Sequence, residues 1–289
     1  MSPLVFALAL SSAAASAWST ILIRQGLRGS TTYTGFWINL MVGTVGLWVA
    51  VLFTEGFGRL SMHGLALFAL AGLIGTAGGR LFRFLSIEQV GASISSALIN
   101  LNPLVSTGLA VLLLGERVTL PILIGTVVIV LGTILLSLGG RQIGVRPAQL
   151  ALPLVSAVCF GVVAILRKTG LGYTGPVLGS AINASTALVA FTTFLLASGQ
   201  PGAMRARGRS LHYFIAAGVA ENAAVFLTVV ALGLGTVSVV TPLTATAPIF
   251  TLFLTYAFLQ GIERLTARIV AGTLLVVLGV YLITALARL

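Results

Sequence analysis

Long apolar segments follow one another along nearly the whole chain, separated by only a few polar or turn-forming residues. An α-helix needs about 20 mostly apolar residues to cross the hydrocarbon core of a bilayer. The pattern therefore predicts an all-α polytopic membrane protein with ten transmembrane helices, over residues 3–23, 31–53, 64–86, 89–114, 119–138, 148–167, 175–197, 210–233, 236–260 and 267–287. These segments leave no room for a soluble domain.

The composition agrees with this pattern. Of the 289 residues, 58% are hydrophobic and 7% are charged, whereas soluble domains carry about 25% charged residues. A net charge of +11 would suggest nucleic-acid binding in a soluble protein, but the sixteen Lys and Arg residues lie mostly at helix ends and form no contiguous basic face. Membrane topology explains the charge better. The single cysteine, Cys159, lies in an apolar segment and excludes an internal disulfide and a cysteine-based metal site.

The first apolar segment resembles a secretory leader, because Ala15-Ser16-Ala17 has the form of a cleavage site. The segment before it lacks the expected basic residues, and a matching segment recurs in the second half of the chain. A removable leader has no reason to recur there. We therefore expect residues 3–23 to form a retained helix.

The second half of the chain repeats features of the first. A shift of 147 residues places Glu116-Arg117-Val118-Thr119 over Glu263-Arg264-Leu265-Thr266 and gives ten identities over residues 116–135. A shift of 144 residues aligns Ser12-Ala13 with Ser156-Ala157 and Ile38-Asn39 with Ile182-Asn183. Shared apolar composition alone would not align charged residues and glycines. The sequence therefore predicts two related halves, residues 1–140 and 141–289, with a boundary at 139–144.

Each half contains five of the predicted helices. Because an odd number of crossings brings the chain to the opposite side of the membrane, the second half must enter from the other face. We therefore expect two inverted five-helix repeats around a central cavity. This architecture is typical of secondary transporters, whose substrates bind near the bilayer midplane between the repeats.

Lys and Arg residues divide unequally between the two ends of the predicted helices. One side holds eleven of them, and the side that bears both termini holds five. Because cytoplasmic loops carry an excess of Lys and Arg, this count places both termini outside the cytoplasm.

Three features together resemble the drug/metabolite transporter superfamily, in its EamA branch. They are the five-plus-five arrangement, the prolines Pro103 and Pro248 in the fourth helix of each half, and a Glu-Arg-x-Thr turn before a Gly-rich fifth helix. The resemblance covers the whole chain and is greatest to the YddG-type exporters of aromatic and other amino acids. The second half departs from the pattern, because Gln260-Gly261-Ile262-Glu263 places two extra residues between Pro248 and Glu263.

This resemblance implies a transporter rather than an enzyme. The implied activity is export of amino acids or similar small metabolites across a bacterial inner membrane by alternating access, without a cofactor. A flippase for lipid-linked headgroups and an intramembrane enzyme stay open as alternatives. The peripheral positions of His63 and His212 argue against the enzyme, because no metal site or nucleophile–base pair can be assembled from the spacing.

All five asparagines lie inside predicted helices, where a polar group needs a partner or a cavity. Asn39 and Asn183 are repeat mates, whereas Asn100, Asn102 and Asn222 lie at helix centres. Each either contacts substrate or makes an interhelical hydrogen bond, which is worth about 0.6 to 2 kcal/mol.

Prolines interrupt the fourth and ninth predicted helices at Pro103, Pro242 and Pro248. A proline frees an upstream backbone carbonyl, and in a membrane that group needs water, a cavity or a hydroxyl. Paired interruptions in both halves point to a binding region, although a structural kink would have the same sequence. The nearby hydroxyls available to these carbonyls or to a substrate amino group are Ser93, Ser95, Ser96, Thr241, Thr244 and Thr246.

Glu221 is the single acidic residue near the centre of a predicted helix. A central carboxyl group can couple transport to protons or bind a substrate ammonium. The structural alternatives are permanent protonation and a buried ion pair with Arg80, Arg83 or Lys168.

Further candidates for substrate contact lie in the first and third helices. Arg80 can bind a substrate carboxylate, with space provided by Gly78 and Gly79, or it can extend towards the lipid headgroups. Trp18, Phe82 and, in the second helix, Trp37 can stack on an apolar substrate or serve only in packing. We expect the cavity to be lined by the centres of the third, fourth, eighth and ninth helices.

Overall fold

The fold is a bundle of helices. The structure, a computed structural model, describes residues 3–54, 61–90, 95, 98–115, 119–139, 147–205, 208–258 and 267–286. In the first half the helices are α1 (Pro3–Gly26), α2 (Thr32–Phe53), α3 (Met62–Ala71), the π-helix η1 (Gly72–Gly79), α4 (Arg80–Val90), α6 (Asn102–Leu114) and α7 (Leu120–Gly139). In the second half they are η2 (Pro147–Leu150), α8 (Ala151–Gly170), α9 (Pro176–Ala197), η3 (Pro201–Met204), α10 (Arg209–Leu234), α11 (Val237–Thr244), α12 (Ala247–Phe258) and α13 (Ala267–Leu286).

Each of the ten predicted segments contains at least one of these helices. Within the described residues, six helices are long and apolar enough to cross a membrane: Pro3–Gly26, Thr32–Phe53, Met62–Val90, Ala148–Gly170, Pro176–Ala197 and Arg209–Leu234. The expectation of an all-helical chain with many apolar spans is confirmed. The third span runs further than expected, to Val90. In the predicted fourth segment Ser95, Leu98 and Ile99 are helical and α6 begins at Asn102, whereas residues 91–94 and 96–97 lie outside the described residues.

Some sequence features lie outside the described residues. These are Ser93, Ser96, both Glu-Arg turns at 116–118 and 261–266, and the boundary between the halves after Gly139. The end of α6 is described, and Gly115 terminates that helix with a positive φ of 64°. Such a left-handed conformation favours glycine and is a common helix end.

The paired prolines begin helices instead of kinking them. Pro103 is the second residue of α6, after a turn at Asn100–Leu101. Pro248 is the second residue of α12, after a turn at Ala245–Thr246. A proline is tolerated in the first turn of a helix because its missing N–H has no intrahelical partner there. The ninth span is therefore divided into two helices, and a turn precedes α6 at the corresponding place.

Three threonine hydroxyls donate to backbone carbonyls around the second interruption. The hydroxyls of Thr241, Thr244 and Thr246 donate to the carbonyls of Val237, Thr241 and Leu243 at 2.8, 2.9 and 2.8 Å, respectively. These bonds keep the backbone polar groups paired inside an apolar bundle.

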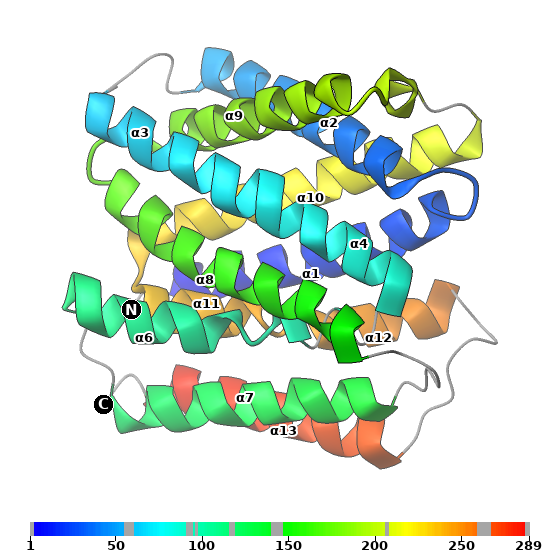
Figure 1. The fold of residues 1–289 in the computed structure, drawn as a ribbon. Coiled ribbons are helices and arrows are strands. Elements are labelled where there is room, and N and C mark those ends of the chain that lie inside the picture. Colours follow the sequence, from blue (N-terminus) through cyan, green and yellow to red (C-terminus); the bar gives the residue numbers. More distant parts are fainter. Residues whose placement is uncertain are drawn as a thin grey trace.

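The helices pack in pairs across the two halves of the chain. α1 packs against α10, α2 against α9, and α7 against α13. α7 and α13 form a layer at one side of the bundle (Figure 1). A Cβ atom built on Gly132 would lie 2.8 Å from the carbonyl of Gly272, and one built on Gly279 would lie 2.7 Å from the carbonyl of Gly125. The lower-numbered end of α7 therefore lies beside the higher-numbered end of α13, and the two helices are antiparallel.

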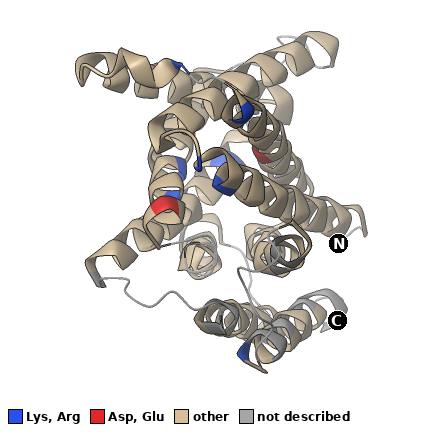
Figure 2. Ribbon diagram, turned by 90° about the vertical axis from the view of Figure 1, so that its right-hand side faces the viewer, with Lys and Arg blue, Asp and Glu red and all other residues tan. Residues whose placement is uncertain are grey.

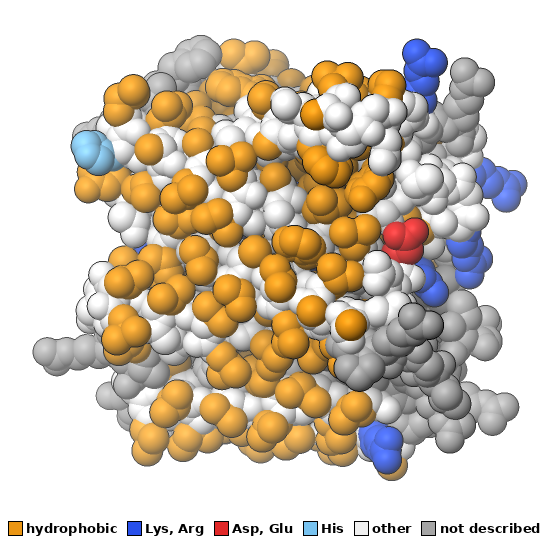
Figure 3. Space-filling model, in the orientation of Figure 1, with side chains coloured by type: hydrophobic (Ala, Val, Ile, Leu, Met, Phe, Trp, Pro, Cys, Tyr) orange, Lys and Arg blue, Asp and Glu red, His pale blue; other side chains and the backbone are white. Residues whose placement is uncertain are grey.

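The outer surface suits a hydrocarbon environment. Hydrophobic side chains cover most of the face in Figure 3, and most of the described Lys, Arg and acidic side chains visible there lie towards its right-hand side. Exposed large apolar side chains include Leu52, Leu112 and Val219 at 68%, 79% and 59%. Figure 2 also shows Lys, Arg and acidic residues on helices within the bundle.

Candidate functional site

A cavity of about 160 Å³ lies inside the bundle. It is surrounded by α1, the third span at η1 and α4, the residues before α6, α8, α10 and the interruption between α11 and α12. A dry protein cavity of about 150 Å³ holds a benzene molecule, so this one has room for a small ligand. Its polar and charged lining consists of Ser12, Ser16, Thr20, Thr76, Arg80, Arg83, Ser95, Asn100, Asn102, Arg167, Glu221, Thr228, Thr241 and Thr244.

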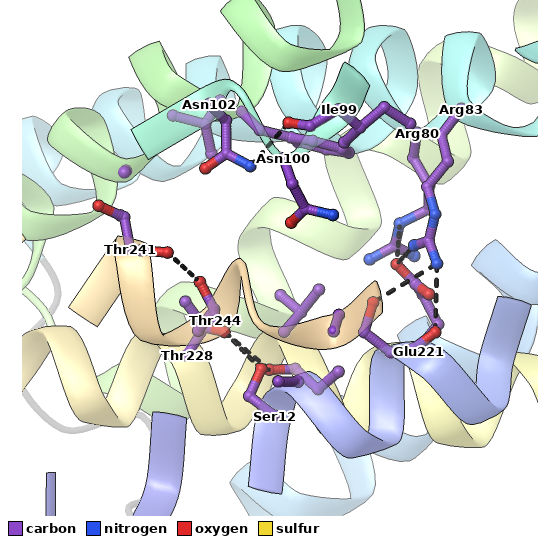
Figure 4. Close-up of a pocket in the computed structure, with 18 of the residues that line it drawn as sticks. Ser12, Arg80, Arg83, Ile99, Asn100, Asn102, Glu221, Thr228, Thr241 and Thr244 are labelled. Carbon is purple, nitrogen blue, oxygen red and sulfur yellow. Dashed lines mark hydrogen bonds and ion pairs between the residues drawn. The ribbon is translucent and has the colours of Figure 1, made fainter. Parts of the chain in front are cut away.

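A buried charge cluster forms one end of this cavity (Figure 4). Glu221 on α10 lies 2.5 Å from Arg83 Nη1 and 3.7 Å from Arg80 Nε, through the same oxygen, Oε1. Glu221 is 4% exposed and Arg80 is 2% exposed. In a region of low dielectric constant each charge requires the other. Of the ion pairs that the sequence allowed for Glu221, the structure contains those with Arg80 and Arg83.

Arg80 points into the bundle and does not extend towards the headgroups. Its Nη1 donates to Asn39 Oδ1 at 2.9 Å and to Asn222 Oδ1 at 3.4 Å. Asn222 Nδ2 in turn donates to the carbonyls of Asn39 and Gly218, at 3.2 and 2.8 Å. Asn39 and Asn222 do not line the cavity. Their side-chain oxygens accept hydrogen bonds from Arg80 outside the cavity lining.

Arg83, which the sequence analysis named only as a candidate partner for Glu221, also lines the cavity. Its Nη2 donates to Thr20 Oγ1 at 2.6 Å and to the carbonyl of Ser16 at 3.3 Å, both on α1. Arg83 thus connects α1, α4 and α10 through one guanidinium group.

Arg167 near the end of α8 is a cavity residue that the sequence reasoning missed. Hydropathy placed it at a helix end, among loop charges. Its Nη2 lies 3.5 Å from both Thr76 Oγ1 and Asn183 Oδ1, and its buried Nε has no hydrogen-bond partner within the described part of the chain. Side chains on a helix lean towards its N-terminus, which explains how a residue of the last turn reaches the interior.

The adjacent Lys168 has a different role. Its Nζ donates to the carbonyls of Leu232 and Gly235 at 2.8 and 2.7 Å. These carbonyls lie at the C-terminus of α10, where a cation is favourable. Lys168 is therefore not the partner of Glu221. Four of the residues in the count of Lys and Arg at helix ends bind inside the bundle. Two of them, Arg80 and Arg83, belong to the side with eleven, and Arg167 and Lys168 belong to the side with five. Without these four residues, the excess of positive charge stays on the same side.

The wall opposite the charge cluster is formed by the two interruptions (Figure 4). Asn102 Nδ2 donates to the carbonyl of Ile99 at 2.9 Å, and Asn100 and Thr244 also line the cavity. Ser106 on α6 donates to Thr241 Oγ1 on α11 at 2.8 Å. The buried prolines Pro103, Pro242 and Pro248 do not line the cavity themselves. Pro103 and Pro248 lie at the starts of α6 and α12, beside Asn102 and Thr246, whereas Pro242 lies inside α11.

Several predicted contact residues lie elsewhere. Trp18 is 37% exposed and packs edge-on against Phe258, with ring centroids 5.0 Å apart. Phe82 is half-buried and lies outside the cavity lining, as do Gly78 and Gly79. A Cβ on Gly79 would lie 2.9 Å from Cys159 Cβ, so this glycine allows α8 to approach the third span. Trp37 donates to Thr192 Oγ1 at 3.0 Å, between α2 and α9.

Asn183, the repeat mate of Asn39, supports the cavity wall from outside. Its Nδ2 donates to Thr76 Oγ1 at 2.7 Å. The expected lining by the third, fourth, eighth and ninth spans is present, and α1 and α8 complete it. Within the described residues, no three His, Cys, Asp or Glu side chains are grouped for metal binding. The cavity therefore offers guanidinium, hydroxyl and amide groups to a small polar ligand.

Comparison with known proteins identifies a family whose sequence pattern the chain matches. The pattern that defines the EamA-like transporter family matches the chain over residues 4–138 and again over residues 148–285. No curated protein matches the sequence significantly. A solved structure described only as "Crystal structure of protein" is similar over 96% of this chain and 96% of its own, with a TM-score of 0.77 and 19% sequence identity. At that identity the likeness concerns the fold alone.

Proposed function

The chain belongs to the EamA-like transporter family of multi-pass membrane proteins, and we propose that it exports amino acids or similar small metabolites across a bacterial inner membrane by alternating access. The observation that carries this proposal is the central cavity, whose wall contains buried charged groups. Charged side chains are costly inside a membrane and mark substrate or ion pathways. A likeness to YddG-type amino-acid exporters agrees with this substrate class.

An inverted repeat of residues 1–140 and 141–289 is the proposed frame for alternating access. The contacts between α7 and α13 support it. Gly132 and Gly279 correspond at the shift of 147 residues, as do Gly125 and Gly272. Gly132 approaches the carbonyl of Gly272, and Gly279 approaches that of Gly125. Exchanging the two halves therefore reproduces this antiparallel contact, as a twofold axis in the membrane plane requires.

Hydrogen bonds near the cavity support the same relation. Ser12 on α1 donates to the carbonyl of Ala224 on α10, and its repeat mate Ser156 on α8 donates to the carbonyl of Gly79 in the third span, both at 2.7 Å. In alternating access, the first and second halves would rock about the cavity that these helices enclose.

Glu221 is the proposed coupling residue. A carboxylate shared by Arg80 and Arg83 can be released from them when a proton or a substrate enters the cavity, which Glu221 lines. The bond from Ser106 to Thr241 joins the two interrupted segments and provides one contact that must change when the cavity opens.

The experiment is transport by purified protein in liposomes, tested against a panel of amino acids with and without a proton gradient. We expect counterflow of at least one amino acid, absent from empty liposomes. Thr228→Trp on α10 would fill the cavity and should abolish transport, whereas Ile215→Trp, at a 40% exposed site on the same helix, should not. A protein that moves no amino acid but transfers lipid-linked headgroups between leaflets would instead be a flippase.

A further inference from the structure

The charges that line the cavity do not balance. Among the described lining residues, Arg80, Arg83 and Arg167 are cationic and Glu221 is anionic. Glu221 lies against Arg80 and Arg83. Arg167 has no carboxylate within 4.0 Å in the part of the chain that the structure describes. An arginine in an apolar bundle is normally paired, so the missing counter-charge needs an explanation.

The donors of Arg167 are largely unused. A guanidinium group has five N–H donors in a fixed plane. In the part of the chain that the structure describes, Arg167 Nε is buried without a hydrogen-bond partner, and the two contacts of Nη2 are 3.5 Å long. Both acceptors are amide or hydroxyl oxygens, and Thr76 Oγ1 already accepts a bond of 2.7 Å from Asn183 Nδ2. Arg167 is thus held in position by neutral groups while its strongest binding capacity, for a planar anion, stays available.

We propose that Arg167, with the hydroxyl of Thr76 beside it, is the subsite for an anionic group of the transported molecule, and that the preferred substrate carries a net negative charge. This inference rests on the proposed transport function and specifies its substrate class. The anionic group is a carboxylate or a phosphate monoester on a small metabolite. A zwitterion brings one negative and one positive group, and so leaves the excess positive charge in place. An acidic amino acid or a phosphorylated hydroxy amino acid reduces it.

Matched substrate pairs test the preference. Uptake into proteoliposomes is measured for glutamate against glutamine, and for phosphoserine against serine. The members of the first pair are nearly equal in size and differ in one anionic group. For wild-type protein we expect the anionic member of at least one pair to have a KM lower by about tenfold or more, as is typical of a buried charge-assisted contact. The pair that shows the difference identifies carboxylate or phosphate as the recognised group.

Variants then assign the preference to Arg167. Arg167→Gln should raise the KM of the anionic substrate by about tenfold or more while changing that of its neutral partner less than about threefold. Arg167→Lys keeps the charge without the planar fork and should recover part of the difference. Arg24→Gln removes a cation that does not line the cavity and should leave the ratio unchanged. Size-exclusion profiles and melting temperatures establish that each variant is folded.

Two outcomes overturn the inference while the transport function survives. One is wild-type protein that moves neutral and anionic partners with equal KM. The other is an Arg167→Gln protein whose ratio of anionic to neutral KM matches that of wild type. Arg167 would then serve only to connect α8 with η1 and α9 through hydrogen bonds. Wild-type protein that moves no member of either pair, nor any other amino acid, overturns the proposed function and this inference with it.

Discussion

Replacing Glu221 with glutamine removes a charge and preserves the shape of the side chain. The carboxylate has two cationic neighbours, Arg83 Nη1 at 2.5 Å and Arg80 Nε at 3.7 Å. At an effective dielectric constant of about 20, opposite charges about 4 Å apart attract by about 4 kcal/mol. Desolvation offsets much of that attraction, and breaking a buried pair by removing one partner costs about 3 to 5 kcal/mol, because the remaining charge is uncompensated.

We therefore expect Glu221→Gln to lower the free energy of unfolding by about 3 to 5 kcal/mol, measured by thermal or denaturant unfolding in detergent. The double variant with Arg83→Gln should lose less free energy of unfolding than the two single variants lose together, because it also removes the Arg83 charge that Glu221→Gln leaves unpaired. The matched control is Glu88→Gln, whose carboxylate is exposed on α4 and accepts a bond of 2.8 Å from Thr32 Oγ1. Glutamine keeps an oxygen that can accept this bond, so the change should alter stability by at most about 1 kcal/mol.

The pH profile of transport separates a coupling role from a structural one. If Glu221 exchanges a proton during transport, the glutamine variant should lose the pH dependence of uptake per folded molecule. A variant that is strongly destabilised but keeps the wild-type pH profile would refute the coupling role. A variant with wild-type stability would refute the electrostatic reasoning, since no other described acidic residue pairs with Arg80 or Arg83.

Three further predictions concern packing and contacts outside the charge cluster. Gly132→Ala and Gly279→Ala should each destabilise the protein in an unfolding assay by similar amounts, about 1 to 3 kcal/mol, because both place a methyl group against a backbone carbonyl of the opposite helix. The control is Gly108→Ala, whose new Cβ has no described atom within 4 Å. It should be neutral or slightly stabilising in the same assay. Lys168→Gln should reduce stability by about 2 kcal/mol without altering substrate preference in competition uptake, because it weakens two bonds to the end of α10. Ser106→Ala should change the turnover rate more than the KM in proteoliposomes, because its hydrogen bond to Thr241 joins two segments that move in the proposed mechanism and does not involve the ligand.

Much of the fold was predictable because hydrocarbon imposes strong constraints on sequence. Apolar runs of sufficient length predicted the helices, and each expected segment contains one. The prolines predicted interruptions in both halves, because a missing N–H is tolerated only at a helix start or beside a polar neighbour. Glu221 and Arg80 were identifiable for a related reason, since a charge near a span centre is rare unless it faces a partner or a cavity.

The residues that the sequence misplaced are those whose side-chain direction decides their role. Arg167 and Lys168 are adjacent, yet one faces the cavity and the other caps α10, because successive residues on a helix point about 100° apart. Hydropathy locates a helix end only to within about one turn and does not show which way each side chain faces around the helix axis. Trp18 and Gly79 lie outside the cavity lining for the same reason, since each lies on a helix that borders the cavity but faces a neighbouring residue instead.

The π-helix at Gly72–Gly79 is the feature that no periodicity predicted, and it bears directly on the site. A π-helical turn adds a residue to the helical repeat, so it rotates everything after it relative to an uninterrupted helix. Arg80 is the first residue after this segment, and Arg83 follows one turn later. Both guanidinium groups face the cavity, whereas Gly79 packs against α8. In the proposed repeat, the corresponding part of α10 is a regular helix that carries Glu221. A local irregularity in one half therefore directs two cations towards a buried carboxylate of the other half.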